Sequence, residues 1–589
     1  MLYSAHFFFP MKKFAALYYF WLCLILTLSA QNKHDYVWPI GYGRIFTHPT
    51  TGDQFGGVVM DFNDSPTSLT LVDYVADRPR AAISDKEGRL VAYTDGCRVL
   101  NREHQVMLNG DTLNPGKVFI EFCEVSSYPI WQCAIFLPAP GSDSLYYLFH
   151  LRDDDKSWNP MNLLYTVIDA AGDGGMGSVV EKNTELISDS LHLGNYVTAT
   201  RHANGRDWWI AVPRRFKNEI HLNLLTPDGA QYMGMQDVPL PKVDSAFWGS
   251  QTAFSPDGSK YFRNSHLGLL MLDFDRCNGT LSNPVYLSWD SLPFGGGGVA
   301  VSPNNRFLYL SSGNEVFQYD LWAPNLAASV QLVAAYDGTL APFPTTFFQM
   351  MPGPDGRIYI CTSYENNVWH VIEHPNEPGI ACKVRQHVIA LPALSSKFVP
   401  NFANYRLGPL DGSPCDTLGI DNPPIAHFRY DVADTLSPLQ LEFTDLSYHE
   451  PTTWLWDFGD GSTSQDTSPV HQYSAPGTYQ VCLTVCNANT CDTECQTVEI
   501  TAVSAVTLQG AGGQVLLWPN PARETLHLQS EKDIERVSII DATGVEILQQ
   551  AAIGMGTQAS VDIRRLSPGL YYIYLLADGR LWSGKFVKI

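Results

Sequence analysis

Six times between residues 81 and 360, an apolar run of strand length is followed by a turn rich in Gly, Asp or Asn and then by a second run rich in aromatic residues. The turns centre on residues 88, 143, 205, 258, 305 and 356, so the unit recurs every 47 to 62 residues. Asp-Gly and Pro-Asp-Gly turns supply the positive φ that a tight hairpin needs. Units near 50 residues with four strand-length runs are typical of β-propeller blades. The pattern therefore predicts an all-β chain whose first two-thirds form a propeller.

The two ends of the repeat region predict a further blade. Apolar runs at residues 56–60 and 69–74 precede the first repeat, and a run at 398–407 follows the last. If these segments pair, the ring closes and leaves no exposed sheet edge. We favour seven blades over residues 31–408, with six or eight as alternatives, because two stacked β-sandwiches would not explain the period. The repeats resemble those of secreted lactonase-like and quinoprotein-like propellers, which implies a fold but no single function.

The first 30 residues have the pattern of an export signal. Lys12 and Lys13 precede an apolar run at residues 14–28, and small residues stand just before Gln31. Fifteen apolar residues are too few to span a bilayer, so a cleaved signal peptide is favoured over a membrane anchor. The rest of the sequence contains no run of transmembrane length. We therefore expect an exported mature chain without a transmembrane segment, in which disulfides can form.

A Pro- and Gly-rich linker at residues 409–424 leads into a different pattern at residues 425–502. Its central motif reads Trp456-Asp457-Phe458-Gly459-Asp460-Gly461. Alternation points Trp456 and Phe458 inward and places Asp460-Gly461 in a hairpin turn. The motif resembles the polycystic-kidney-disease (PKD) domain, which implies an immunoglobulin-like β-sandwich. We expect the motif to shape the fold; adhesion or glycan contact, with calcium near Asp457 and Asp460, is the alternative.

Four cysteines at the end of this domain fit one hairpin register. With residues 487–490 as the loop, Cys482 lies opposite Cys495 and Cys486 opposite Cys491. Directly opposed residues are close to the spacing of a disulfide, so we predict two cross-strand bonds. A four-cysteine zinc site is the alternative, but it would favour Cys-x-x-Cys spacing.

The other seven cysteines of the mature chain are not paired by any pattern. Cys123 with Cys133 and Cys361 with Cys382 are candidate pairs by proximity in the sequence. The remaining three, Cys97, Cys277 and Cys415, leave at least one thiol unpaired.

After a second linker at residues 503–514, residues 515–589 predict a small β-sandwich. Its motifs are Pro-Asn-Pro, an Asp-x-x-Gly turn, a Ser-Pro-Gly turn and a basic C-terminal strand. The residues concerned are Pro519, Asn520, Pro521, Gly544, Pro568, Gly569, Lys585 and Lys588. In this order they resemble the C-terminal sorting domain of the type IX secretion system. The resemblance implies a Bacteroidota-type bacterium, recognition by the type IX export machinery, and a product attached to the cell surface or released.

Charge narrows the set of partners. The chain has 60 acidic and 38 basic residues and a formal net charge of −22. Nucleic acids and anionic membranes attract basic surfaces, so neither is expected as a partner. An extracellular glycan or protein ligand remains open.

The sequence contains few signs of catalysis. No nucleophile elbow, zinc-protease helix motif or Walker sequence occurs, and no cofactor or resident metal is expected. Six polar residues near predicted strand ends could converge in a central channel: His150, Arg152, Asp153, Arg201, His202 and Glu365. We therefore expect a non-catalytic binding or adhesion protein that displays a propeller through the PKD module. The alternative is a secreted propeller hydrolase or lyase acting on glycans or lactones.

Overall fold

The computed structural model describes residues 32–588 apart from 75–76, 157–158, 191, 216, 240–250, 266, 289–296, 396, 433–438, 501–505, 511–514, 542–543 and 552–556. The expected signal peptide at residues 1–30 lies outside the described residues. The chain divides into two compact units. The first comprises Met1–Ala426, Leu446–Thr452 and Val485–Asp492, and the second comprises His427–Asp445, Thr453–Thr484 and Thr493–Ile589.

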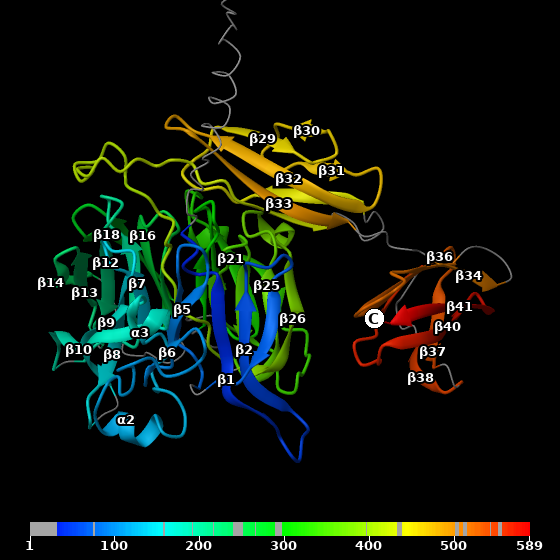
Figure 1. Ribbon diagram of the computed structural model, residues 1–589, viewed down its shortest axis with the longest axis horizontal. Helices are drawn as coiled ribbons and strands as arrows, with labels where there is room; N and C mark the ends of the chain where they lie inside the picture. Colours follow the sequence, from blue (N-terminus) through cyan, green and yellow to red (C-terminus); the bar gives the residue numbers. More distant parts are fainter. Residues whose placement is uncertain are drawn as a thin grey trace, which may run out of the picture. The chain divides into compact units, whose positions relative to one another are not determined.

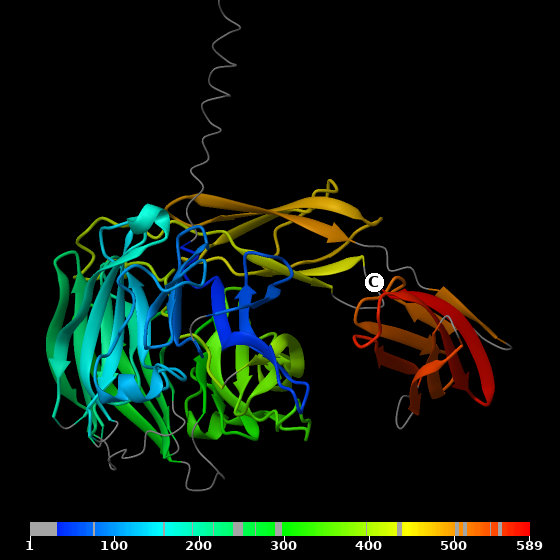
Figure 2. The ribbon, with the colours of Figure 1, turned by 60° about the horizontal axis from the view of Figure 1, so that its bottom comes forward.

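The first unit is a β-propeller whose sheets stand side by side around one axis (Figures 1 and 2). The unit contains five four-stranded antiparallel meanders, of which four are separate sheets and the fifth, β23–β26, belongs to a seven-stranded sheet that also includes β1–β3. Their strands are β7 (Ala134–Pro138), β8 (Leu145–Asp153), β9 (Pro160–Asp169) and β10 (Ser178–Ser188); β11 (Thr198–Arg201), β12 (Trp208–Pro213), β13 (Glu219–Thr226) and β14 (Gly229–Asp237); β15 (Gln251–Phe254), β16 (Lys260–Ser265), β17 (Gly268–Asp275) and β18 (Thr280–Ser288); β19 (Val299–Val301), β20 (Phe307–Ser311), β21 (Glu315–Asp320) and β22 (Gln331–Ala335); and β23 (Phe347–Pro352), β24 (Ile358–Thr362), β25 (Asn366–Ile372) and β26 (Val384–Ser395). The first strand of one sheet contacts the first strand of the next: β11 contacts β15, β15 contacts β19, and β19 contacts β23.

Two further groups of strands complete the ring. One is the three-stranded sheet of β4 (Ala81–Ser84), β5 (Leu90–Thr94) and β6 (Val99–Asn101), and the other is formed by β1 (Val37–Thr47), β2 (Gln54–Asp61) and β3 (Ser68–Val72). On one side, β1 and β2 share an apolar core with β23–β26, in which Trp38 contacts Tyr359 at 5.5 Å. On the other side, Val59 and Val72 pack against a core that includes Tyr93 of β5. The β1–β3 group therefore stands in the seventh blade position.

The repeat turns lie between the first and second strand of each blade, where the sequence predicts them. Gly88, Gly205, Gly258, Asn305 and Gly356 all have positive φ, between 60° and 90°. In the remaining hairpin the positive φ belongs to Gly141, two residues before the centre predicted from the pattern. Backbone conformation thus explains why these turns are so rich in Gly, Asp and Asn.

The expected closing strand at residues 398–407 does not form. β2 and β3 form strands and pair with each other, and the described sheet hydrogen bonds of β2 also reach β26, not residues 398–407. Pro400 lacks the N–H that a ladder requires. Phe398 to Arg406 instead runs through the centre of the ring, where Phe402 lies 5.7 Å from Trp38. In this axial segment seven of the nine residues are buried, and none belongs to a strand.

Asn401 ties the axial segment to several blades at once. Its side-chain nitrogen donates to the carbonyl oxygens of Ala134 (2.9 Å) and Val197 (2.8 Å), and its oxygen accepts from Gln132 (2.9 Å). The same Gln132 nitrogen also donates to the carbonyl oxygen of Thr252, at 3.0 Å. Asn401 and Gln132 together thereby link three successive inner strands, β7, β11 and β15, or their approaches.

Helical segments among the described residues are short. They are α2 (Lys117–Phe122), α3 (Gly172–Gly175), η1 (Ala327–Ser329) and η2 (Gly379–Cys382). No helix in this part of the chain is long and apolar enough to cross a membrane.

The PKD region has two sheets. Its strands are β27 (Phe428–Val432), β28 (Gln440–Asp445) and β31 (Val470–Gln472) in one sheet, and β29 (Thr453–Asp457), β30 (Thr463–Ser464), β32 (Gly477–Cys486) and β33 (Cys491–Ile500) in the other. Trp456 is fully buried, with its ring centre 5.1 Å from Phe428 and 5.5 Å from Phe443. Rings from both sheets thus form the core, as in an immunoglobulin-like sandwich.

The C-terminal region contains eight described strands around a separate core. They are β34 (Val506–Gly510), β35 (Val515–Trp518), β36 (Thr525–Ser530), β37 (Ile534–Ile540), β38 (Glu546–Ala551), β39 (Gln558–Asp562), β40 (Gly569–Ala577) and β41 (Arg580–Lys588). Alternate residues of these strands, such as Val537, Ile539, Ile573 and Leu575, are buried in one cluster. The alternation that the sequence predicts is therefore the inward face of a sandwich.

Candidate functional site

His150 is a core residue. Its Nδ1 lies 2.7 Å from Asn114 Oδ1, and its Nε2 lies 2.9 Å from Thr166 Oγ1. The Thr166 hydroxyl accepts from the Asn183 N–H, so it can donate to Nε2. Burial lowers the pKa of His150 to about 3. Because both nitrogens of the neutral His150 ring are hydrogen-bonded, the ring holds the chain before α2 against β8. Neither nitrogen is free to take part in catalysis.

Arg152 and Asp153 are neighbours with different surroundings. Arg152 Nε donates to the Pro115 carbonyl oxygen (2.7 Å), and its Nη2 lies 3.4 Å from Asp155. Asp153 is 1% exposed; its backbone N–H donates to Tyr128 Oη, while neither carboxylate oxygen has a partner. Burial, reinforced by the charge of Asp154, raises the pKa of Asp153 to about 7. Among the six candidates, Asp153 is thus the one whose titratable carboxyl group has a shifted pKa and no hydrogen-bond partner.

Arg201 and His202 anchor the chain that leaves the axis. The Arg201 guanidinium lies over the Trp208 ring, at 3.7 Å, and donates to the Tyr405 carbonyl oxygen (3.0 Å). Burial, together with the charge of Arg276, lowers the pKa of Arg201 to about 9. His202 Nε2 lies 3.0 Å from the Cys277 carbonyl oxygen. Both side chains therefore hold backbone in place.

Glu365 has different neighbours from the other five candidates. It faces the Tyr42 hydroxyl, and the pKa of Tyr42 is raised first by burial and then by Glu365. The six candidates thus have separate partners, and the structure does not bring them into one site. Residues 398–406, most of which are buried, run along the axis, where Asn401 bonds to Ala134 and Val197 and Tyr405 bonds to Phe136.

A pocket of about 460 Å³ lies between the turns of the β4–β6 and β7–β10 sheets. Its charged side chains pair with one another: Lys86 with Asp143, and Arg89 with Asp85 (2.7 Å) and Glu87 (3.1 Å). The remaining charged side chain of the lining, Arg102, lies 3.9 Å from Glu103, so each charge on that wall has an opposite charge beside it.

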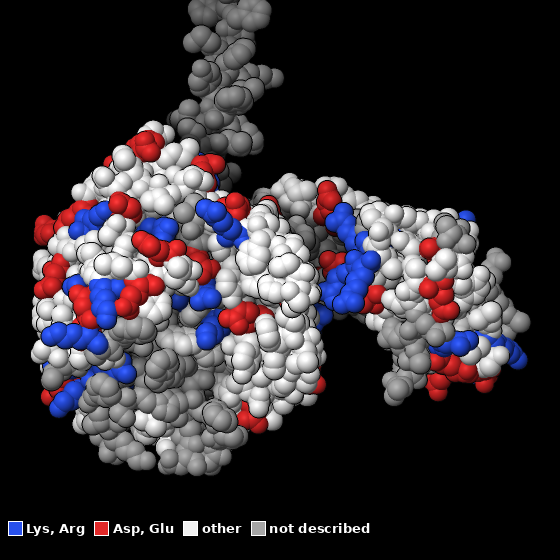
Figure 3. Space-filling model, turned by 90° about the horizontal axis from the view of Figure 1, so that it is seen from below, with Lys and Arg blue, Asp and Glu red and all other residues white. Residues whose placement is uncertain are grey.

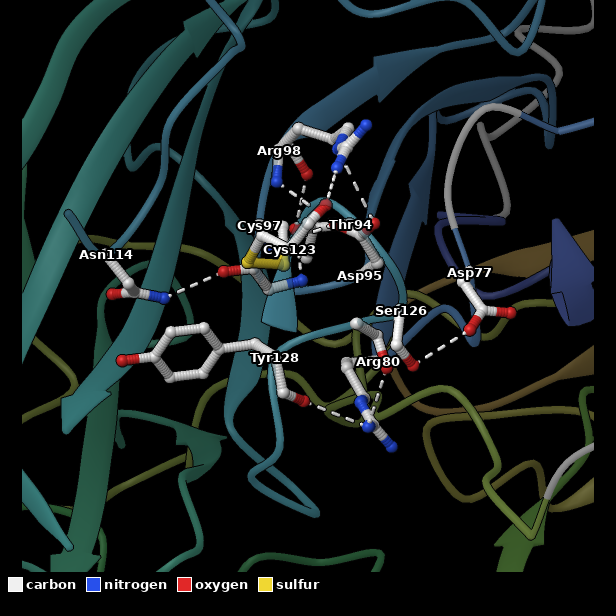
Figure 4. Close-up of a disulfide and its surroundings, with 12 residues drawn as sticks. Asp77, Arg80, Thr94, Asp95, Cys97, Arg98, Asn114, Cys123, Ser126 and Tyr128 are labelled. Carbon is white, nitrogen blue, oxygen red and sulfur yellow. Dashed lines mark hydrogen bonds and ion pairs between the residues drawn. A yellow bond between two sulfur atoms is a disulfide. The ribbon is translucent and has the colours of Figure 1, made fainter. Parts of the chain in front are cut away.

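Arg80 is the functional candidate that sequence reasoning missed. It directly precedes β4, is 3% exposed, and leaves Nε and Nη1 without a partner (Figure 4). In the sequence it is one arginine of Asp-Arg-Pro-Arg, and only the fold shows that no carboxylate of a described residue forms an ion pair with it. Seen from the end of the propeller that carries α2, basic and acidic side chains are interspersed (Figure 3).

The propeller cysteines pair differently from the two candidate pairs. Cys97 is bonded to Cys123, and Cys277 to Cys415, across 26 and 138 residues. The three others, Cys133, Cys361 and Cys382, are free and buried. Burial raises the pKa values of these thiols to about 12, 12 and 11. The candidate pairs Cys123–Cys133 and Cys361–Cys382 are wrong, because Cys123 is bonded to Cys97 and because Cys361 and Cys382 lie in different core clusters. Burial makes the free thiols unreactive.

The hairpin of β32 and β33 has residues 487–490 as its loop. Cys482 is bonded to Cys495 and Cys486 to Cys491, with Cα–Cα distances of 4.1 and 4.0 Å. Val481 and Leu483 are buried on the opposite face. The zinc alternative is excluded at these sulfurs, since all four are oxidised in disulfides.

The PKD motif forms an aromatic and ionic cluster. Phe458 stacks on His471 with ring centres 4.0 Å apart, and His471 Nε2 lies 2.8 Å from Asp460 Oδ2. Asp460 Oδ1 accepts from the Ser462 N–H, and Asp457 Oδ1 accepts from the Gly459 N–H, both at 2.9 Å. Both carboxylates shape the turn. Within the described residues, no cluster of three or more His, Cys, Asp or Glu side chains could hold a metal ion.

Asn520, Gly569, Lys585 and Lys588, four of the candidate sorting residues, lie on or beside the last strand, β41. Asn520 Oδ1 accepts from the Val587 N–H (2.9 Å), and Gly569 pairs with Lys588 across β40 and β41. Gly544 has a φ of 88° in the turn that follows Asp541. The Pro-Asn-Pro segment and the basic terminus thus form one local structure.

Two family models match the chain. Residues 421–502 match the PKD domain, and residues 516–589 match the secretion system C-terminal sorting domain.

Curated relatives match only parts of the chain. The microbial collagenase of Vibrio alginolyticus is 44% identical over 59 residues, which are 10% of this chain and 6% of the collagenase. The pre-pro-metalloprotease PrtV of Vibrio cholerae is 32% identical over 150 residues, 24% of this chain and 16% of PrtV. The chain thus spans only a small fraction of either protein.

Solved structures resemble separate regions. The PKD1 domain of Vibrio cholerae PrtV is 31% identical, covering 13% of this chain and 98% of that domain, with a TM-score of 0.12. The Dos1 propeller is 11% identical, covering 54% and 79% of the two chains, with a TM-score of 0.35. Hydrazine synthase of Kuenenia stuttgartiensis is 12% identical, covering 60% and 97%, with a TM-score of 0.32.

Taken with the sheets described above, the matched regions identify the parts of this molecule. The chain combines a β-propeller with a PKD domain and a type IX secretion C-terminal sorting domain, which directs it to the cell surface or the extracellular space.

Proposed function

We propose that the protein is a non-catalytic binding or adhesion protein that presents its propeller outside the cell. The observation that carries the proposal is the filled axis. A propeller enzyme would need reactive side chains converging on a space that admits substrate. Here Asn401, Tyr405 and their neighbours occupy the axis and bond to the inner strands.

The partners of the candidate side chains also support binding over catalysis. His150 and His202 contact amide, hydroxyl or carbonyl groups, and Arg201 contacts carbonyl oxygens. A general base must reach its proton within hydrogen-bond distance, and a nucleophile needs an adjacent base. No such pair is formed by these six residues.

A secreted hydrolase or lyase acting on glycans or lactones is the alternative. Asp153 favours it, because a carboxyl with a pKa of about 7 is matched to proton transfer near neutral pH. Its neighbours are Tyr128, Arg215 and the acids Asp154 and Asp155, and neither of its carboxylate oxygens is hydrogen-bonded to any of them. The enzyme alternative is therefore supported by Asp153 alone.

The test is a combined binding and turnover experiment on the mature chain. A glycan array and a panel of extracellular proteins should reveal a ligand, and that ligand should be recovered chemically unchanged. Release of reducing ends or lactone opening that Asp153→Asn abolishes would establish the enzyme instead. Asp228→Asn, at an exposed turn position, is the matched control.

A further inference from the structure

Arg80 carries a buried charge that has no ion-pair partner among the described residues. Its Nη2 donates to Ser127 Oγ (3.1 Å) and to the Tyr128 carbonyl oxygen (3.0 Å). Nε and Nη1 have no partner, and Figure 4 shows one terminal nitrogen directed away from Tyr128. Burial lowers the pKa of Arg80 to about 10, which leaves the guanidinium protonated at neutral pH. A buried cation with two open donors is rare and calls for an explanation.

The nearest acids have partners of their own (Figure 4). Asp95 Oδ1 accepts from the N–H groups of Cys97 and Arg98, and its Oδ2 lies 3.7 Å from Arg98 Nε. Asp77 Oδ2 accepts from Ser126 Oγ (3.1 Å) and lies 3.7 Å from Arg78 Nε. Each acid thus forms its ion pair with another arginine and acts on Arg80 through its charge alone, so Arg80 has no ion-pair partner of its own among the described residues.

Aromatic rings and a second cation stand next to Arg80. Its guanidinium carbon lies 3.5 Å from the centre of the Phe398 ring, and Phe398 lies 5.3 Å from the Trp131 ring. Lys397 Nζ also lies 5.0 Å from the centre of the Trp131 ring. Phe398 is 8% exposed, whereas Trp131 and Lys397 are only half-buried and remain accessible from solvent. Trp131 precedes β7, so these groups come from the approaches to two neighbouring inner strands and from the axial segment.

We propose that Arg80, Lys397 and Trp131 form a binding site for the carboxylate or sulfate group of an acidic saccharide. The anion would accept from the open N–H groups of Arg80 and lie near the Lys397 ammonium. The half-buried indole offers the flat apolar surface on which the C–H face of a sugar ring packs. Sites of this kind combine aromatic walls with a few fixed polar groups. The inference rests on the proposed binding function and names its ligand class.

The overall acidity of the chain adds selectivity. A net charge of −22 repels polyanions at long range, so an anionic ligand needs a local cationic centre to bind. Arg80 and Lys397 provide that centre while acids elsewhere discourage non-specific association. A short acidic saccharide is therefore favoured over a long polyanion.

Isothermal titration of the mature full-length chain tests the site with defined probes. Trigalacturonate supplies carboxylates, a chondroitin sulfate tetrasaccharide supplies sulfates, methyl-esterified trigalacturonate removes the charge, and sodium sulfate removes the sugar. We expect binding of at least one acidic saccharide and at least tenfold weaker binding of the esterified probe. The two acidic probes distinguish carboxylate from sulfate as the recognised group.

Substitutions locate the site. Arg80→Gln should weaken binding at least tenfold, and Lys397→Gln should weaken it severalfold. Lys156→Gln removes one exposed positive charge and should leave affinity unchanged. If Arg80→Gln fails to fold, Lys397→Gln and Trp131→Ala decide the question, since both act at half-buried positions. Equal binding by Lys397→Gln, Trp131→Ala and the parent protein would overturn the proposal.

Other results separate this inference from the proposed function. Binding of neutral glycans alone, unaffected by these substitutions, would refute the acidic-saccharide site and leave a binding function intact. Binding of sodium sulfate as tight as that of the saccharides would reduce the site to an ion site and refute the saccharide assignment. Cleavage of a bound saccharide would refute the non-catalytic function while the Arg80 dependence could still hold.

Discussion

The Arg406 guanidinium makes two hydrogen bonds to the Asp35 carboxylate, at 2.6 and 2.5 Å, and joins the end of the axial segment to the residues just before β1. Both side chains are buried. The pair therefore connects positions 371 residues apart and fastens the two ends of the propeller. Removing one partner of a buried ion pair leaves an uncompensated charge, which typically costs 3–5 kcal/mol.

We expect Arg406→Ala and Asp35→Asn each to lower the free energy of unfolding of the propeller by about 3–5 kcal/mol. The double variant should cost clearly less than the sum of the single variants, because the charges then disappear together. Urea denaturation in a double-mutant cycle measures both effects. Additive losses, or losses below about 1 kcal/mol, would show that the pair is not what fastens the ends.

Asp153 predicts an unusual dependence of stability on pH. Its folded pKa is about 7 against a model value of 3.8, so the fold favours the protonated carboxyl. At high pH, ionisation of this carboxyl favours the unfolded state and so lowers the stability of the fold. The loss of stability disappears as the pH falls from about 7 to below 4. The shift corresponds to roughly 4 kcal/mol at alkaline pH.

Asp153→Asn should therefore stabilise the protein at pH 8 by up to about 4 kcal/mol and have little effect at pH 4. Chemical denaturation across this range measures the difference, with Asp228→Asn as the exposed control. A stabilisation that is the same at both pH values would contradict the assigned titration.

Much of the propeller could be predicted because its determinants are local. The hairpin turns follow from the backbone needs of single residues such as Gly258 and Gly356, and these recur with the blades. Likewise, the pairing of Cys482 with Cys495 follows from one strand register and one short loop. Period and register can be read from neighbouring residues.

The missed features depend on contacts between distant residues. Cys277 finds Cys415 after 138 residues, and no local pattern encodes that meeting. The apolar alternation of residues 398–407 suggested a strand, but Pro400 and the bonds of Asn401 place the segment on the axis instead. Arg80 could not be singled out from the sequence, since only the folded structure shows that its Nε and Nη1 have no hydrogen-bond partner.

The four disulfides should contribute unequally to stability. Their sequence separations are 138 for Cys277–Cys415, 26 for Cys97–Cys123, 13 for Cys482–Cys495 and 5 for Cys486–Cys491. A cross-link restricts the unfolded chain more when the loop is longer, which gives about 5, 3.5, 3 and 2 kcal/mol in that order.

Paired Cys→Ala substitutions followed by denaturation test this order. The matched comparison is Cys277→Ala/Cys415→Ala against Cys486→Ala/Cys491→Ala, because each removes one bond and two sulfurs. A larger loss from the hairpin pair would mean that strain or residual structure, and not loop length, sets the contribution. Non-reduced peptide mapping of the parent protein checks that all four bonds form.

The C-terminal region should be necessary for surface delivery and unnecessary for folding of the propeller. Its core is separate from the propeller cores, so deleting residues 515–589 removes no apolar partner from the blades. We expect the truncated chain to accumulate in the periplasm in folded form, while the parent chain reaches the surface or the medium. Asn520→Ala removes the bond to the Val587 N–H and should reduce delivery partially, whereas Lys532→Gln, at an exposed position, should leave it unchanged. Cell fractionation and protease accessibility on intact cells measure delivery, and thermal unfolding of the periplasmic product measures folding. Normal surface display of the truncated chain would refute the sorting role, and an unfolded truncated chain would assign the region a structural role instead.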